Sequence, residues 1–182
     1  MSAREKILND VRSNQPENVP LPNIAWPNND LNVESFMSTL RSIGSEVMIA
    51  ANRDSITEGI STKFGNDKRI VSNIETSSRE EMEKIDVAIV EGQIGVAENG
   101  AIWIDGDTTS HRVIPFICQH LVIVLPENKI VSTMHHAYDI IDVAAPGFGV
   151  FIAGPSKTAD IEQSLVIGAH GARSLTVYIL RD

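Results

Sequence analysis

Short apolar runs alternate with segments of helical periodicity along most of this chain. The run at residues 121–125 is made only of valine, isoleucine and leucine and is ended by Pro126, as expected of a buried strand. Residues 30–43 instead place Phe36, Leu40 and Ile43 at helical spacing before Gly44, which predicts a helix and its stop. Helices are also predicted at residues 54–64, 78–84, 110–117 and 131–143, and strands at residues 47–50, 69–72, 87–90 and 175–180. The alternation favours a three-layer α/β/α sandwich, with helices on both faces of a mostly parallel sheet.

One turn signal interrupts the alternation. Asn99-Gly100 lies between two short β-prone runs, at residues 94–97 and 101–104. Asn-Gly is favoured in two-residue hairpin turns, because both positions tolerate positive φ angles. We therefore predict an antiparallel hairpin and a mixed sheet.

Charge and cysteine content limit the possible partners. The 182 residues include 24 acidic and 15 basic side chains, a net charge of −9, and no basic cluster, so nucleic acid is an unsuitable partner. No apolar run approaches the roughly 20 residues of a membrane span, and no signal peptide is visible. The single cysteine, Cys118, provides neither a disulfide framework nor the ligands of an iron–sulfur cluster, and we expect it to be an inert buried thiol. We expect a cytoplasmic protein.

The N-terminal 29 residues differ in character from the rest. Residues 2–13 predict a short helix with Ile7, Leu8 and Val11 on one side. Four prolines within residues 16–27 then predict an extended arm. We expect residues 1–29 to pack across the protein's own domain rather than a neighbouring subunit, and residues 30–182 to form a single α/β domain.

The segment from residue 149 to residue 173 contains a candidate anion site. It is predicted to form a strand at residues 150–153, a turn at Gly154-Pro155, and a helix at residues 159–167 with Thr158 as N-cap. Ser156, Lys157 and Thr158 would then surround a helix N-terminus, which favours a carboxylate or phosphate ligand. In the alternative reading, Asp160 and Glu162 satisfy the helix end themselves. The glycine and lysine spacing does not fit a Walker A loop.

Gly-Pro-Ser-Lys-Thr-Ala-Asp-Ile-Glu at residues 154–162 and Gly-Ala-His-Gly at residues 168–171 resemble the signature of the LUD-domain family, in particular its lactate-utilisation protein C group. The resemblance covers essentially the whole chain. Lys157 and Ala172 depart from it, since the family has arginine and proline there. A lysine keeps the charge but loses the bidentate geometry of a carboxylate clamp.

This resemblance implies both an architecture and a function. The architecture is that of coenzyme A transferases and ribose-5-phosphate isomerases. The function is that of a subunit of a cytoplasmic assembly that oxidises L-lactate to pyruvate. In such an assembly the iron–sulfur clusters are expected on cysteine-rich partner subunits, and this chain contributes no redox cofactor ligands.

Glu98-Asn99-Gly100 also resembles the motif of coenzyme A transferases, in which the glutamate is the nucleophile. The alternative function is therefore a free-standing enzyme, similar to a coenzyme A transferase or a sugar-phosphate isomerase, that uses Glu98. A shared architecture does not carry over an activity, and an exposed acid in a hairpin turn is the simpler interpretation of Glu98.

Three further side chains complete the candidate site. Arg112 and His120 stand where the family commonly has arginine and histidine. Arg112 is expected either to clamp a carboxylate or to cap a short helix, and His120 to act as a general base or only to begin a strand. His170, between Gly168 and Gly171, allows close approach of a ligand. We expect one pocket to gather Glu98, Arg112, His120, Ser156, Lys157, Thr158 and His170. His135 and Asp139, one helical turn apart, are interpreted as surface residues rather than metal ligands.

Overall fold

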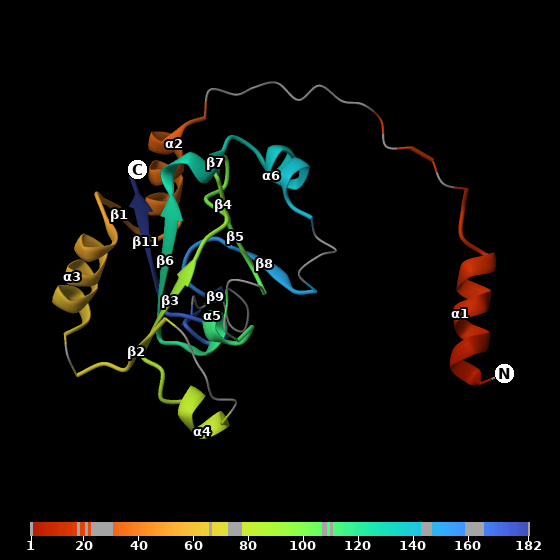
Figure 1. Cartoon of the computed structure of the whole chain (residues 1–182), viewed down its shortest axis with the longest axis horizontal. Helices are drawn as coiled ribbons and strands as arrows, with labels where there is room; N and C mark the ends of the chain where they lie inside the picture. The colour runs from red at the N-terminus through yellow and green to blue at the C-terminus, as the bar shows by residue number, and fades with distance from the viewer. Residues whose placement is uncertain are drawn as a thin grey trace.

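A computed structural model describes residues 2–17, 19–20, 22, 31–65, 67–72, 78–106, 109, 111–142, 147–158 and 166–181. Its centre is a parallel sheet of five strands in the order β1-β11-β6-β3-β2 (Figure 1). The strands are β1 (Glu46–Ala50), β2 (Ile70–Val71), β3 (Val87–Glu91), β6 (His120–Pro126) and β11 (Ser174–Leu180). The predicted α/β class with a mostly parallel sheet is confirmed.

The central strand β6 is apolar at its five inner positions, because both faces of the sheet are covered. In β6, Leu121, Ile123 and Leu125 belong to one core cluster, whereas Val122 and Val124 belong to the other. All five side chains are almost fully buried. The alternation follows from the two-residue period of a strand, which sends successive side chains to opposite faces.

Helix α3 (Arg53–Phe64) covers one face of the sheet. It begins at Asn52, whose side chain accepts a hydrogen bond of 2.9 Å from the backbone N–H of Ser55. Ile56 and Ile60, one turn apart, pack against β6 and Tyr178 of β11. A capped N-terminus and an apolar stripe of helical period thus explain both where this helix forms and which side it buries.

The opposite face is covered by helices and by a second sheet. Helix α2 (Val33–Ser42) buries Phe36 and Leu40 completely. Two single-turn helices, α4 (Arg79–Met82) and α5 (Ile114–Ile117), add Met82 and Ile114 to the same core. The layers are therefore α3, the parallel sheet, and then a layer shared by helices and strands.

The second sheet contains the predicted hairpin. Its order is β7-β4-β5-β8, with β4 (Ile94–Val96) antiparallel to β5 (Ile102–Asp105). Gly100 has a φ of 71° in the turn, as the Asn-Gly signal requires. β7 (Ile130–Val131) pairs parallel with β4, and β8 (Gly149–Ile152) pairs antiparallel with β5. The hairpin is confirmed, but it lies in its own sheet rather than extending the central one.

Helix α6 (Met134–Ile140) covers the outer face of the second sheet. Its buried Ala137 packs with Val96 and Trp103. Residues 131–143 were predicted to be helical throughout, and this is wrong for Val131, which pairs with Val96 in the sheet. Valine is β-branched and favours extended backbone. The pairing with β4, in which the N–H of Ala97 donates to the carbonyl oxygen of Val131 over 2.9 Å, holds Val131 in the sheet.

The helix predicted at residues 159–167 is wrong at Val166 and Ile167, its last two residues, which form a strand. Lys157–Thr158 (β9) and Val166–Ile167 (β10) form a short antiparallel ribbon in which Thr158 pairs with Val166. Thr158 is thus a strand residue, and the residues that it was predicted to cap lie outside the described part of the chain. Three of the four ribbon residues are β-branched, which favours extended backbone. Residues 159–165, which include Asp160, lie outside the described residues.

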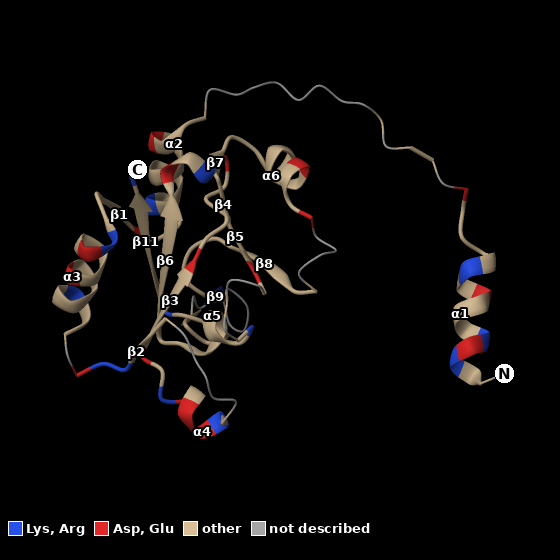
Figure 2. Cartoon of the chain, in the orientation of Figure 1, with Lys and Arg blue, Asp and Glu red and all other residues tan. Residues whose placement is uncertain are grey.

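Helix α1 (Ala3–Ser13) forms as predicted and begins with a capping box between Ser2 and Glu5. None of its residues is buried, and Ile7, Leu8 and Val11 are exposed. Acidic and basic residues are interspersed along α1, α3 and α4 (Figure 2). Most of the arm at residues 18–30 lies outside the described residues, so its packing across the domain stays a prediction. Of the helices described, none is both long and apolar enough to cross a bilayer.

Candidate functional site

A cavity of about 230 Å³ lies beside β8, in the region that the sequence singled out; we call it the β8 cavity. Its walls come from α5, from β8, from the first residues of β6 and β11, and from two loops, at residues 153–156 and 170–172. The lining residues are Pro115, Phe116, Leu121, Val150, Phe151, Ile152, Ala153, Gly154, Pro155, Ser156, His170, Gly171, Ala172 and Leu175.

The two loops are held together by backbone hydrogen bonds. The N–H of Ser156 donates to the carbonyl oxygen of Ala172 over 2.8 Å, and the N–H of Gly168 donates to the carbonyl oxygen of Ser156 over 3.0 Å. A Cβ atom added at Gly171 would lie 3.3 Å from the Cβ of Ser156. Glycine therefore allows the two loops to approach closely, and Ser156 and His170 come to line one cavity.

The β8 cavity is largely apolar, with a hydroxyl and an imidazole as its side-chain hydrogen-bonding groups. Such an arrangement suits a small ligand with a short carbon skeleton and one polar end. The Ser156 hydroxyl can donate a hydrogen bond to a carboxylate or phosphate, and so can a ring N–H of His170. The sequence did not predict the contributions of Pro115, Phe116 and Leu121, because these residues lie outside the segment at residues 149–173 and share no motif with it.

Lys157 follows Ser156 but points elsewhere. Its ammonium group donates to the carbonyl oxygen of Ile43, the C-cap residue of α2. A Cβ atom added at Gly44 would lie 3.1 Å from the same Nζ atom. The lysine supplies a hydrogen-bond donor to a carbonyl oxygen at the C-terminus of α2, and its positive charge interacts favourably with the negative end of the helix dipole.

Glu98 lies at the hairpin turn, where its side chain is exposed. One carboxylate oxygen, Oε1, accepts a hydrogen bond of 2.7 Å from the backbone N–H of Met134, the first residue of α6. The backbone N–H of Glu98 also donates to the carbonyl oxygen of Ser132. Glu98 therefore ties the hairpin to the start of α6 and places a negative charge at its N-terminus, which stabilises the helix.

His120 begins β6, at the amino ends of the parallel strands. Its Nδ1 atom lies 2.7 Å from the hydroxyl oxygen of Ser174, and its ring centroid lies 5.3 Å from that of Phe64. Burial lowers the pKa of His120, and the positive charges of Arg173, Lys68 and Lys63 add to this effect against an opposing contribution from Asp86. The neutral imidazole is thus favoured.

The predicted site residues occupy several places. Ser156 and His170 share the β8 cavity, and Thr158 lies in the adjoining ribbon. Arg112 is exposed in the turn before α5. Within the described part of the chain, Glu98, Arg112, His120 and Lys157 are not among the residues that line the β8 cavity. Their ligand-binding and catalytic roles stay predictions, as does the role of Asp160.

Cys118 is 2% exposed, and burial raises its pKa to about 11. At neutral pH the side chain is therefore a protonated thiol, which is neither a nucleophile nor a metal ligand. The expectation of a buried thiol is confirmed.

Comparison with known proteins points to one family. The profile described as LUD domain matches residues 2–180. Proteins named Lactate utilization protein C are similar over about half of the chain. The one from Oceanobacillus iheyensis is 32% identical over 106 residues, which is 55% of this chain and 45% of that protein. The one from Anoxybacillus flavithermus is 33% identical over 104 residues, or 57% and 47% of the two chains. The matched region is thus less than half the length of these relatives.

A solved structure shares the fold. The crystal structure of a DUF162 family protein from Deinococcus radiodurans aligns with a TM-score of 0.61 at 16% sequence identity, covering 81% of this chain and 95% of that one. An identity this low supports the architecture alone.

Proposed function

Because this chain belongs to the LUD-domain family, we propose that it acts as a lactate utilization protein C-like subunit in the oxidation of L-lactate to pyruvate. The observation that carries the proposal is the family match over residues 2–180, together with relatives of that name at 32% and 33% identity. We place this role in the cytoplasm.

The redox chemistry is proposed to belong to other subunits. Iron–sulfur clusters are typically held by four cysteine thiolates, and this chain has one cysteine. That cysteine is buried, and its pKa is raised to about 11. Its residues do not fit a cluster site, so we propose cysteine-rich iron–sulfur proteins as the partners that accept the electrons of lactate.

The part played by this chain is proposed to be ligand binding. L-lactate and pyruvate are small carboxylates with short carbon skeletons. The β8 cavity, of about 230 Å³, combines apolar walls with the Ser156 hydroxyl and the His170 imidazole. These two groups would hold a carboxylate by hydrogen bonds, while Phe116 and Val150 contact the carbon skeleton.

Deletion of the gene in its own host tests the pathway. We expect the deletion strain to lose growth on L-lactate as sole carbon source but to keep growth on pyruvate. A plasmid copy of the gene should restore growth on lactate. Unchanged growth on lactate would contradict the proposal, provided that no second gene of this family is present.

A biochemical test addresses the partners and the cavity. The tagged chain, purified from lactate-grown cells, should co-elute with iron and acid-labile sulfide, and the eluate should reduce a dye when L-lactate is added. Replacement by Ser156→Ala should slow this reduction at low lactate concentration. An eluate without iron, sulfide or lactate-dependent reduction would count against the proposed assembly.

The alternative of a free-standing enzyme that uses Glu98 stays a prediction from the sequence. The hydrogen bond from Met134 to the Glu98 carboxylate accounts for this residue by a capping role.

A further inference from the structure

The β8 cavity offers more space than L-lactate fills. Its volume is about 230 Å³. An apolar protein cavity of about 150 Å³ holds one benzene molecule, which has six carbon atoms. At the same volume per atom, the β8 cavity has room for about nine non-hydrogen atoms. L-lactate has six, so it would leave about a third of the cavity unfilled.

Two walls of the β8 cavity come from the two sheets. Leu121 of β6 is in register with Leu175 of β11, and each is 2% exposed. Val150 and Ile152 are two positions apart in β8 and therefore share one face of that strand. Both pack against the core cluster that contains Leu121 and Leu175, so this face is turned toward the central sheet. The cavity thus has one apolar wall on the central sheet and another on β8.

Helix α5 supplies a third apolar wall and the rim. Pro115 is buried, whereas Phe116 is 40% exposed. His170 is exposed as well, and Ser156 is half-buried. A carboxylate held by these two polar residues at the rim keeps part of its hydration, which lowers the cost of binding a charged group. The carbon chain of the same ligand would then enter between the apolar walls.

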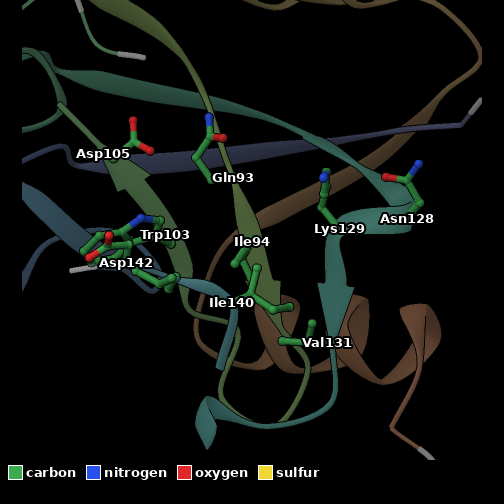
Figure 3. A pocket seen from close by; sticks show the side chains of 10 residues that line it. Gln93, Ile94, Trp103, Asp105, Asn128, Lys129, Val131, Ile140 and Asp142 are labelled. Carbon is green, nitrogen blue, oxygen red and sulfur yellow. The ribbon is translucent and has the colours of Figure 1, made fainter. Parts of the chain in front are cut away.

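The lining of the β8 cavity carries no lysine, arginine, aspartate or glutamate among the described residues. A second cavity, of about 400 Å³, differs in this respect. Figure 3 shows Asp105, Lys129 and Asp142 among its lining residues. A hydrocarbon chain that enters a charged cavity also removes water from the charges, and this opposes binding. Of these two cavities, the β8 cavity is therefore the better site for an uncharged carbon chain.

Walls on two sides favour a branched chain. The single methyl group of L-lactate is too small to contact both walls, whereas the two methyl groups of an isobutyl chain point in different directions. Each further methyl or methylene group that leaves water strengthens binding about fourfold. A branched chain also has fewer rotatable bonds to immobilise than a straight chain with the same number of atoms.

We propose that the β8 cavity binds branched-chain 2-hydroxy acids, of the type of L-2-hydroxyisocaproate, in preference to L-lactate. This acid has nine non-hydrogen atoms, which matches the space available. Its carboxylate accepts hydrogen bonds from Ser156 and His170 at the rim, and its isobutyl group lies between Leu121 and Val150. The inference rests on the proposed function, in which this cavity binds a small hydroxy acid, and it specifies the size and shape of that acid.

A series of four acids tests the size of the ligand by calorimetric titration of the full chain. L-lactate, L-2-hydroxyisovalerate, L-2-hydroxyisocaproate and L-phenyllactate share the carboxylate and the hydroxyl group and increase in size. Affinity should rise to L-2-hydroxyisocaproate, which should bind at least tenfold more tightly than L-lactate. It should then fall for L-phenyllactate, whose twelve non-hydrogen atoms exceed the space. L-lactate binding as tightly as L-2-hydroxyisocaproate, or more tightly, would overturn the inference.

Variants that fill the cavity test its location. Val150→Phe should lower the affinity ratio of L-2-hydroxyisocaproate to L-lactate at least tenfold, because the larger side chain occupies the space of the isobutyl group. Ile152→Phe, on the same face of β8, is a second variant in case the first does not fold. Ile49→Phe is the matched control, since Ile49 is 44% exposed on β1 and does not line the cavity, and it should keep the wild-type ratio.

Ser156→Ala tests the polar end separately. It should weaken the binding of all four acids by a similar factor, because they share the carboxylate. The wild-type affinity ratio in a filled variant that unfolds like the wild type would overturn the inference.

The titrations also separate this inference from the proposed function. Measurable binding of all four acids with similar affinities would overturn the size preference alone and leave the proposed function in place. If none of the four bound at concentrations up to about 10 mM, the β8 cavity would lose its proposed role in ligand binding, and this inference would fail with it.

Discussion

The carboxylate of Glu98 accepts a hydrogen bond of 2.7 Å from the backbone N–H of Met134, across 36 positions of sequence. The contact joins the turn of the β4–β5 hairpin to the first residue of α6. A residue that resembles a catalytic nucleophile in sequence thus has a structural partner. The structural and the catalytic interpretation of Glu98 predict different defects when this residue is replaced.

Glu98→Ala should lower the free energy of unfolding by about 1 kcal/mol, because α6 loses an N-terminal acceptor and a favourable charge. Urea denaturation measures the change. Glu58→Ala, at an exposed position within α3, is the control and should alter stability by less than about 0.5 kcal/mol. Wild-type stability in Glu98→Ala, combined with loss of activity, would instead favour a catalytic role.

Lys157→Ala should keep the fold and lose about 0.3–1 kcal/mol of stability, because the last carbonyl of α2 loses its cation. Lys157→Arg restores a cation at this position and should recover most of the loss. The sequence-based hypothesis of an anion site predicts in addition that Lys157→Ala weakens phosphate or carboxylate binding. Unchanged binding of phosphate and L-lactate, measured by calorimetry, would exclude that role.

Gly95→Ala should destabilise the protein by about 1–3 kcal/mol, because the two sheets pack closely at this residue. An added Cβ atom would lie 2.6 Å from Cδ2 of Leu125 and 3.0 Å from Cζ of Phe36. Gly65→Ala provides a contrast, because among the described residues other than its chain neighbours no atom lies within 4 Å of the added Cβ, and only the φ of 71° would strain an alanine. Thermal unfolding of both variants separates crowding from backbone strain. A Gly95→Ala protein as stable as the wild type would show that the core relaxes freely.

The pKa of His120 is lowered in the folded protein, first by burial and then by nearby positive charges. The unfolded chain, with an ordinary histidine pKa of about 6.5, therefore binds a proton more readily. The contribution of His120 to stability is complete above that value and is lost as the pH falls below it. The wild type should lose more stability than His120→Gln between about pH 7.5 and about pH 5.5. Equal losses in urea denaturation at the two pH values would contradict this account.

Sequence patterns predicted the structure correctly where the residues that interact lie close together in the sequence. The helical spacing of Phe36 and Leu40 predicts both α2 and its buried side. Asn99-Gly100 predicts the hairpin, and Gly100 does adopt a positive φ of 71° in its turn. Ser156 and His170, both within the recognised signature, do line one cavity.

The sequence by itself thus determined the α/β class, most of the helices and strands, and the family. Only the tertiary structure decided that the hairpin forms a sheet of its own, that Thr158 and Val166 pair as strands, and that Lys157 reaches Ile43. The physical reason is that each of these outcomes depends on a partner distant in sequence. The Lys157 hydrogen bond spans 114 positions. Helical and strand periodicity describe which face a residue occupies, but not which distant group it meets there.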